Sequence, residues 1–93
     1  NNLSVMDFTL HQNYPNPFNP ATAIRFSLPQ KETVTLAVYN IYGEAVSVLI
    51  NAQPMEAGEH QVNFNADLLS SGVYLYKMYT SGHVVSRKMT LIK

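Results

Sequence analysis

Residues 69–79 have the sequence LSSGVYLYKMY, and this stretch decides the fold. Its Ser-Ser-Gly segment is a turn signal, because glycine adopts a positive φ at little steric cost. The side chains after the turn fall on two faces, Val73, Leu75 and Tyr79 on one and Tyr74, Tyr76 and Met78 on the other. A two-residue period with many aromatic and β-branched residues predicts a half-buried β-strand.

The same stretch has the spacing of a tyrosine corner. Leu68 precedes Tyr74 by six residues, with Gly72 between them and an alternating strand afterwards. In immunoglobulin-type sandwiches a tyrosine at this place bonds its hydroxyl to the backbone a few residues upstream. The alternative is that Tyr74 is one more aromatic residue of the strand.

Four other segments show the same alternation, and turns that contain Gly or Pro separate them. Their apolar positions are Ile24, Phe26 and Leu28; Val34, Leu36 and Val38; Val62 and Phe64; and Val85, Met89 and Leu91. A further short run lies at 45–50, and no long window has a helical period. This pattern predicts an all-β fold, an antiparallel immunoglobulin-like β-sandwich of about seven strands.

The N-terminal stretch differs from the strands. Residues 10–20 have the sequence LHQNYPNPFNP and hold three of the five prolines. Proline fixes φ, lacks a backbone donor and restricts the residue before it, so the segment is neither a helix nor a central strand. We expect a stiff, extended lead-in whose Tyr14 and Phe18 anchor against the edge of the sandwich. Residues 1–9 are expected to be a linker.

The composition excludes several classes of function. The 93 residues have a formal net charge of +0, only 13% of them are charged, and there is no cysteine. Nucleic acid is not an expected partner, because proteins that bind it have a basic balance. No apolar run is long enough to span a membrane. The chain starts at Asn1 without a signal peptide, so we expect a piece of a longer chain.

Residues with catalytic or metal-binding chemistry are scattered. The three histidines show no ligand spacing, and His60 is in phase with the apolar Val62 and Phe64, as a packed histidine is. The acidic residues fall mostly in predicted turns, and the chain has no nucleophile motif and no phosphate-binding loop. We therefore expect no enzyme activity, no catalytic residues, no metal site and no cofactor.

The last predicted strand is basic. Arg87, Lys88 and Lys93 place half of the Lys and Arg residues within the final seven positions. Two interpretations are open. The charges protect an edge strand against aggregation, or the exposed strand is offered to a receptor that pairs with it by β-augmentation.

Four motifs, in this order, resemble those of a known family. They are YPNPFNP at 14–20 followed by TAIRF at 22–26, VYNIYG at 38–43, LSSGVYLY at 69–76 and the ending KMTLIK at 88–93. Over residues 10–93 the chain is similar to the type A C-terminal sorting domains of the type IX secretion system. A similar opening motif occurs in the immunoglobulin-like domain of flagellar hook-capping proteins.

The resemblance implies a non-catalytic sorting and anchoring domain at the C-terminus of a larger exported protein. Residues 1–9 would be the linker from an upstream cargo domain, with the cleavage site, and residues 10–93 the sorting domain. The implied partners are the outer-membrane translocon and a sortase-like peptidase. The protein would pass through the periplasm and then reach the cell surface or the medium.

The predicted recognition residues follow the motifs. They are Tyr14, Pro15, Asn16, Pro17, Gly72 and Tyr74, together with the basic Arg87, Lys88 and Lys93 of the last strand. Exposed edge strands are also a place where two copies could pair as a homodimer. The alternative functions are an accessory module of an extracellular enzyme, binding carbohydrate or the neighbouring domain, and an assembly domain like that of the hook cap.

Overall fold

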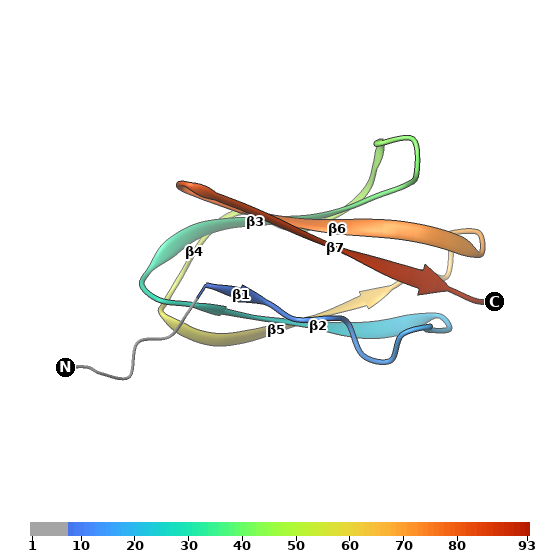
Figure 1. Ribbon diagram of the computed structural model, residues 1–93, viewed down its shortest axis with the longest axis horizontal. Helices are drawn as coiled ribbons and strands as arrows, with labels where there is room; N and C mark the ends of the chain where they lie inside the picture. The colour runs from blue at the N-terminus through green and yellow to red at the C-terminus, as the bar shows by residue number, and fades with distance from the viewer. Residues whose placement is uncertain (1–7) are drawn as a thin grey trace.

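The computed structural model describes residues 8–93, which form two antiparallel sheets packed face to face (Figure 1). The seven strands are β1 (Thr9–Leu10), β2 (Ala21–Leu28), β3 (Glu32–Tyr39), β4 (Ala45–Met55), β5 (Gly58–Asn65), β6 (Gly72–Thr80) and β7 (His83–Leu91). None of the described residues belongs to a helix that could cross a membrane. The predicted all-β sandwich of about seven strands is confirmed.

One sheet has the order β1-β2-β5 and the other β4-β3-β6-β7. The fourth strand, β4, pairs with β3, whereas in a constant-type immunoglobulin domain the fourth strand joins the first two in their sheet. The chain then crosses from β4 to β5 and back to β6. Because β1 is only two residues long, the outer edge of β2 is left to the segment that follows β1.

The core lies between the sheets and is built from the predicted alternating positions. Ile24, Phe26 and Leu28, Val34, Leu36 and Val38, and Phe64, Tyr76, Met78, Met89 and Leu91 are all buried. On β6, Tyr74, Tyr76 and Met78 face inward, while Val73 is 40% exposed. The predicted division of this strand into two faces is therefore confirmed, and the structure adds which of the two is buried. The run at 45–50 is the first half of the longer β4.

The N-terminal lead-in is bent, so the predicted extended segment is wrong. After β1 the chain makes a bridge at Tyr14 to Ala23 of β2, bends, and makes a second bridge at Phe18 to Leu91 of β7. Phe18 is buried as predicted, with 2% of its surface exposed. Tyr14 is 82% exposed, so its predicted anchoring is wrong. Backbone hydrogen bonds hold the segment there, and its side chain is left outside.

Two residues before the predicted domain boundary at residue 10 already take part in the fold. Thr9 is already in β1, and the ring of Phe8 stacks on the His83 ring with centroids 4.7 Å apart. The remaining predicted linker, residues 1–7, lies outside the described residues. The division into linker and sorting domain stays a prediction.

Candidate recognition surface: the N-terminal clamp and the last strand

The segment 12–18, called here the N-terminal clamp, lies along the outer edge of β7. Phe18 N–H donates to the carbonyl of Thr90 at 3.0 Å, and Ile92 N–H donates to the carbonyl of Phe18 at 3.0 Å. β1, just before the clamp, belongs to the opposite sheet. The N-terminal stretch thus crosses from one sheet to the other and closes one side of the sandwich (Figure 1).

Side chains of the same stretch add further bonds to β7. Asn16 Oδ1 accepts a hydrogen bond from Thr90 N–H at 3.0 Å, and Gln12 Nε2 donates to the carbonyl of Lys88 at 2.7 Å. From the other direction, Arg87 Nε donates to the carbonyl of Leu10 at 2.6 Å. The two ends of the chain are therefore joined by polar contacts that span more than 70 residues of sequence.

A buried amide shapes the clamp from inside. Asn13 is 2% exposed, and its Nδ2 donates to Thr22 Oγ1 at 3.0 Å and to the carbonyl of Pro15 at 3.1 Å. Thr22 Oγ1 donates to the same Pro15 carbonyl at 2.8 Å. Buried polar groups need such partners, because an unpaired one keeps its full desolvation cost. The bend of the clamp is thus fixed by side chains that also satisfy one another.

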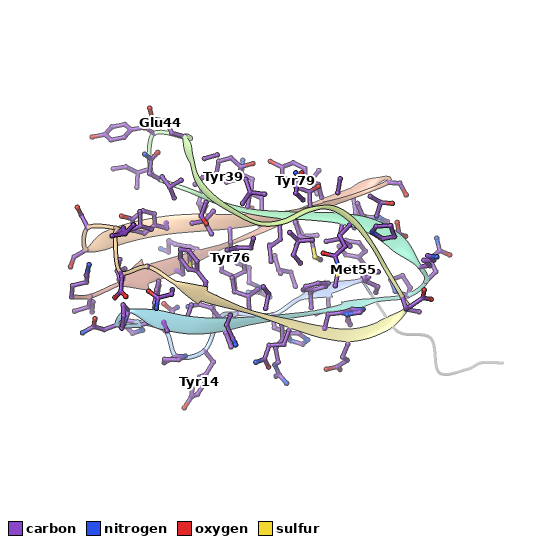
Figure 2. The ribbon with its side chains drawn as sticks, turned by 180° about the vertical axis from the view of Figure 1, so that it is seen from behind. Tyr14, Tyr39, Glu44, Met55, Tyr76 and Tyr79 are labelled. Atoms are coloured by element: carbon purple, nitrogen blue, oxygen red, sulfur yellow. The ribbon has the colours of Figure 1, made fainter. Side chains whose placement is uncertain are left out.

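Tyr76 connects the clamp to the core. Its side chain lies between the sheets (Figure 2) and is 0% exposed. The Tyr76 hydroxyl donates to the carbonyl of His11 at 2.6 Å and accepts from Asn13 N–H at 2.8 Å. Burial raises the pKa of Tyr76, so the hydroxyl keeps the proton that it donates.

The predicted motif residues of the clamp have different places. Asn16 and the Pro15 carbonyl are in the hydrogen-bond network, and Pro17 is exposed. Tyr14 exchanges backbone hydrogen bonds of 3.0 Å with Ala23, and its ring points away from the sandwich (Figure 2). The clamp therefore leaves the side chains of Tyr14 and Pro17 free for contact with a partner.

A second group of predicted residues holds the turn at 66–71. The Tyr74 hydroxyl donates to the carbonyl of Ser70 at 2.7 Å, so the predicted tyrosine corner is confirmed. Lys93 Nζ donates to the carbonyls of Asp67 and Leu69, and Lys93 N–H donates to Ser71 Oγ at 2.9 Å. Gly72 begins β6 directly after this turn. The end of β7 is thus tied to the start of β6.

The three basic residues of the last strand are not equivalent. The charged groups of Arg87 and Lys93 donate hydrogen bonds to backbone carbonyls. Within residues 8–93, the Lys88 side chain is exposed and makes no hydrogen bond, ion pair or ring contact. Lys88 is therefore the basic residue of this strand whose charge is available to a partner.

Only part of the β7 edge is open. The backbone N–H and C=O of Thr90 point toward the clamp, away from β6. Because the direction of these groups alternates along a strand, the backbone groups of Val84, Ser86 and Lys88 also point away from β6. The clamp takes the carbonyl of Lys88 and both groups of Thr90. In the described part of the chain, the outward groups of Val84 and Ser86 stay without a partner.

Two residues of this arrangement, Asn13 and Tyr76, were not among the predicted sites. The alternation placed Tyr76 on the same face as Tyr74 and Met78, and the structure shows that this face is the buried one, where a tyrosine brings its hydroxyl to a partner. That signal shows that a partner exists. It does not identify the partner, because the two residues are 63 positions apart.

Other candidate chemistry has structural roles. The His60 ring stacks on Phe26 at 5.4 Å between centroids, and His60 Nε2 lies 2.7 Å from the carbonyl of Glu56, so the predicted packed histidine is confirmed. Across residues 8–93, no three His, Asp or Glu side chains gather in a way that could hold a metal ion.

Tyrosines on the outer face of the larger sheet are likewise engaged. The hydroxyls of Tyr39 and Tyr79 lie 2.9 Å apart, and Lys77 Nζ lies 5.0 Å from the centre of the Tyr39 ring. The hydrogen bond to Tyr79 raises the pKa of Tyr39. The lysine occupies a face of this ring on which a sugar could otherwise stack.

The family model of the secretion system C-terminal sorting domain matches residues 12–93, from the first residue of the clamp to the end of the chain. The chain belongs to this family. Its members are the sorting domains of type IX secretion, and the resemblance seen in the sequence is confirmed. No curated protein matches the chain significantly.

Membership gives the function in outline. The domain is a non-catalytic sorting signal for type IX secretion, the system that handles cargo proteins carrying such domains. A signal of this kind implies export to the cell surface or the medium. The matched range covers both groups of motif residues, those of the clamp and those that hold the 66–71 turn.

Proposed function

We propose that the domain is read as a folded object in which the clamp and β7 form one recognition surface. The observation that carries this proposal is the set of hydrogen bonds between residues 12–18 and residues 88–92. Motifs at the two ends of the sequence lie side by side only after folding. A receptor that bound an unfolded tail would meet the terminal residues alone.

Around the clamp and β7 the domain offers a partner three things, on different faces of the sandwich. They are the exposed Tyr14 ring, the free ammonium group of Lys88, and the unpaired backbone of β7 at Val84 and Ser86. An added strand could pair with this short edge, and the charge would select the partner and its register. The proposed partner is the outer-membrane translocon, reached from the periplasm, and a sortase-like peptidase then acts on the chain before residue 10.

The experiment is export of a reporter with a signal peptide and residues 1–93, in a host that has the type IX system. The full fusion should reach the surface or the medium, and a fusion that lacks residues 84–93 should stay in the periplasm. Lys88→Ser should lower export, whereas Thr33→Ser, on the same sheet, should not. Periplasmic retention of the full, folded fusion would contradict the proposed function.

Pairing of two copies through edge strands is a separate proposal, and β5 is the edge that suits it. β1 has two residues, the clamp covers part of β7, and β4 has register shifts, Pro54 and Ala52 at φ 49°. β5 instead pairs with β2 over eight residues without interruption, and its other edge faces no strand. A long, regular edge is a site of strand pairing.

The β5 edge can be tested without disturbing the fold. Ala66 N–H donates to Pro20, so by alternation Gln61 and Asn63 point their backbone groups away from β2. Gln61→Lys with Asn63→Lys should place like charges opposite one another in an antiparallel pair and abolish any dimer seen by analytical ultracentrifugation. A dimer that persists unchanged in this variant does not use the β5 edge.

A further inference from the structure

Exposed apolar side chains gather at one end of the sandwich. Of the large hydrophobic residues that are exposed in the described chain, five lie where β3 and β7 end and β6 begins: Ile41, Tyr42, Leu68, Val73 and Ile92. The hairpin that joins β3 to β4 rises above the sheet at this end, which is also the end at which the chain terminates (Figure 1). Of these five, Ile41, Tyr42 and Val73 line one groove, and a contiguous exposed apolar patch marks an interaction surface.

The opposite end has a different character. Its turns carry Lys31 and Glu56, with Nζ and Oε2 3.7 Å apart, and Glu32, whose carboxylate accepts from Ser81 Oγ at 3.0 Å. Phe8 stacks on His83 at this same end. Phe8, the first described residue, therefore lies at the charged end, opposite the apolar end.

The turn at residues 40–44, called here the tip, is locked by one asparagine. Asn40 Oδ1 accepts from the N–H groups of Tyr42 and Glu44 at 2.9 and 3.0 Å, and Asn40 Nδ2 donates to Glu44 Oε1 at 2.8 Å. Backbone bonds join Asn40 to Glu44 and Gly43, each 3.0 Å long. Gly43 has a φ of +82°, which glycine adopts without strain.

This ordered turn holds two large side chains in solvent. Ile41 is 70% exposed and Tyr42 is 82% exposed. Neither belongs to the hydrophobic core or packs against it. Ordering a turn costs conformational entropy, and here the result is a pre-organised pair of apolar side chains that folding does not use. Pre-organised aromatic and aliphatic anchors are what tight protein interfaces are built around.

A surface groove runs beside the tip. It is lined by Asn40, Ile41 and Tyr42 on one side and by residues 70–74 on the other. The tyrosine corner and the contacts of Lys93 fix the second wall. The end of the sandwich thus presents a projecting apolar pair next to a groove with rigid walls, which is a shape that an interlocking protein surface can match.

The charges at this end favour a protein over a lipid surface. Glu44 is bound by Asn40, and the ammonium group of Lys93 is bound by two backbone carbonyls. Neither the turn at 40–44 nor the groove wall at 70–74 contains a Lys or Arg residue. Binding to an anionic membrane surface depends on exposed Lys and Arg side chains. An apolar, charge-poor pocket on a protein complements this end better.

We infer that the tip is a docking element: Ile41 and Tyr42 insert into an apolar pocket of a protein of the secretion machinery, and the groove at 70–74 receives an apolar side chain of that same protein. The inference rests on the proposed function, since it names the face of the domain that the machinery contacts. It adds a second contact to the one made by the clamp and β7.

The test is export of the reporter fusion with Ile41→Ser and Tyr42→Ser combined. The matched control is Val48→Ser, which removes a 55% exposed aliphatic side chain from β4, away from the tip. The tip variant should lower the exported fraction by about tenfold or more, as loss of interface anchors does. The control should be exported like the unchanged fusion, and both purified variants should unfold at the same urea concentration as the unchanged domain.

The outcomes separate the two proposals. Normal export of the tip variant would overturn the docking element and leave the sorting function intact. Retention of the unchanged fusion would overturn the sorting function, and the docking element with it. Two further measurements can also overturn the docking element. If the unchanged domain self-associates in ultracentrifugation and the tip variant does not, the tip binds a second copy of the domain. If the unchanged domain binds phosphatidylethanolamine–phosphatidylglycerol vesicles and the tip variant does not, the tip binds lipid.

Discussion

The N-terminal clamp and the tip are both short turns ordered by an asparagine, yet they use that order in opposite ways. Asn13 is buried and bonds Thr22 of β2 and the Pro15 carbonyl inside the clamp, and the clamp buries Phe18 in the core. Asn40 is at the surface, and the tip that it closes leaves Ile41 and Tyr42 in solvent. The same local chemistry serves stability in one place and display in the other.

The difference between the two turns shows where this small domain tolerates substitutions without unfolding. Contacts of the clamp join both sheets and both ends of the sequence, so their loss should be felt throughout the molecule. Contacts of the tip lie within five residues, 40–44. Variants of the buried residues of the clamp should therefore act mainly on stability, and variants of the tip mainly on recognition.

The largest effect is expected from Phe18→Ala, which removes the buried anchor of the clamp. Loss of a buried aromatic ring lowers the free energy of unfolding by about 3–5 kcal/mol. Urea unfolding followed by circular dichroism measures it. The control is Tyr14→Ala in the same clamp, which should change the free energy by no more than about 0.5 kcal/mol because the ring is exposed. Equal losses in the two variants would contradict this division.

The next effect compares the two asparagines directly. Asn13→Ala removes the amide that bonds Pro15 and Thr22 in the interior, and should cost about 2–3 kcal/mol. Asn40→Ala opens an exposed turn and should cost about 0.5–1 kcal/mol, because water can replace the lost bonds. If Asn40→Ala were the more damaging substitution in urea unfolding, the tip would be part of the stable fold and not a separate display.

Tyr76→Phe tests the link between the clamp and the core. It removes the hydroxyl that serves His11 and Asn13, and should lower the free energy of unfolding by about 1–2 kcal/mol. The variant should also change the response to alkali. Because burial raises the pKa of Tyr76 above its unfolded value, the folded state binds this proton more tightly.

The stability that comes from this proton is complete below about pH 10, where the hydroxyl is protonated in both states, and decreases as the pH rises beyond that value. Urea unfolding between pH 8 and pH 11 should therefore show a shallower alkaline loss for Tyr76→Phe than for the unchanged domain. Parallel pH profiles would mean that the hydroxyl is not buried in this way.

The smallest effect on stability is expected from the double substitution at the tip. Ile41→Ser with Tyr42→Ser should change the free energy of unfolding by no more than about 0.5 kcal/mol, since neither side chain packs on the core. Urea unfolding of the purified domain measures this beside the export assay. A loss of unfolding free energy comparable with that of Phe18→Ala would show that the tip stabilises the fold as the clamp does.

Much of the fold could be predicted from the sequence because strand alternation is a local signal. The phase of β6, the tyrosine corner and the packed His60 all depend on residues a few positions apart. The errors lie in the proline-rich segment. Proline excludes helix and central strand there, yet it does not say where the chain bends. Tyr14 was therefore predicted to anchor the segment, although only Phe18 reaches the core.

The candidate site was predictable in its motifs and not in its geometry. Arg87, Lys88 and Lys93 look alike in sequence, and the structure distinguishes them by the carbonyls that Leu10, Asp67 and Leu69 bring near two of them. The strand predicted to be exposed is open only in its first half, because the clamp covers the rest.

By itself the sequence determined the class of the fold, the alternation of two faces in five of the seven described strands and, through its motifs, the family. These properties depend on side-chain periodicity and on residue types in a fixed order, and both can be read without knowledge of the tertiary contacts. Only the tertiary structure decided that the two ends of the chain form one surface and that Ile41 and Tyr42 are left free. Such pairings join residues far apart in sequence, and they are set by how two sheets share one core.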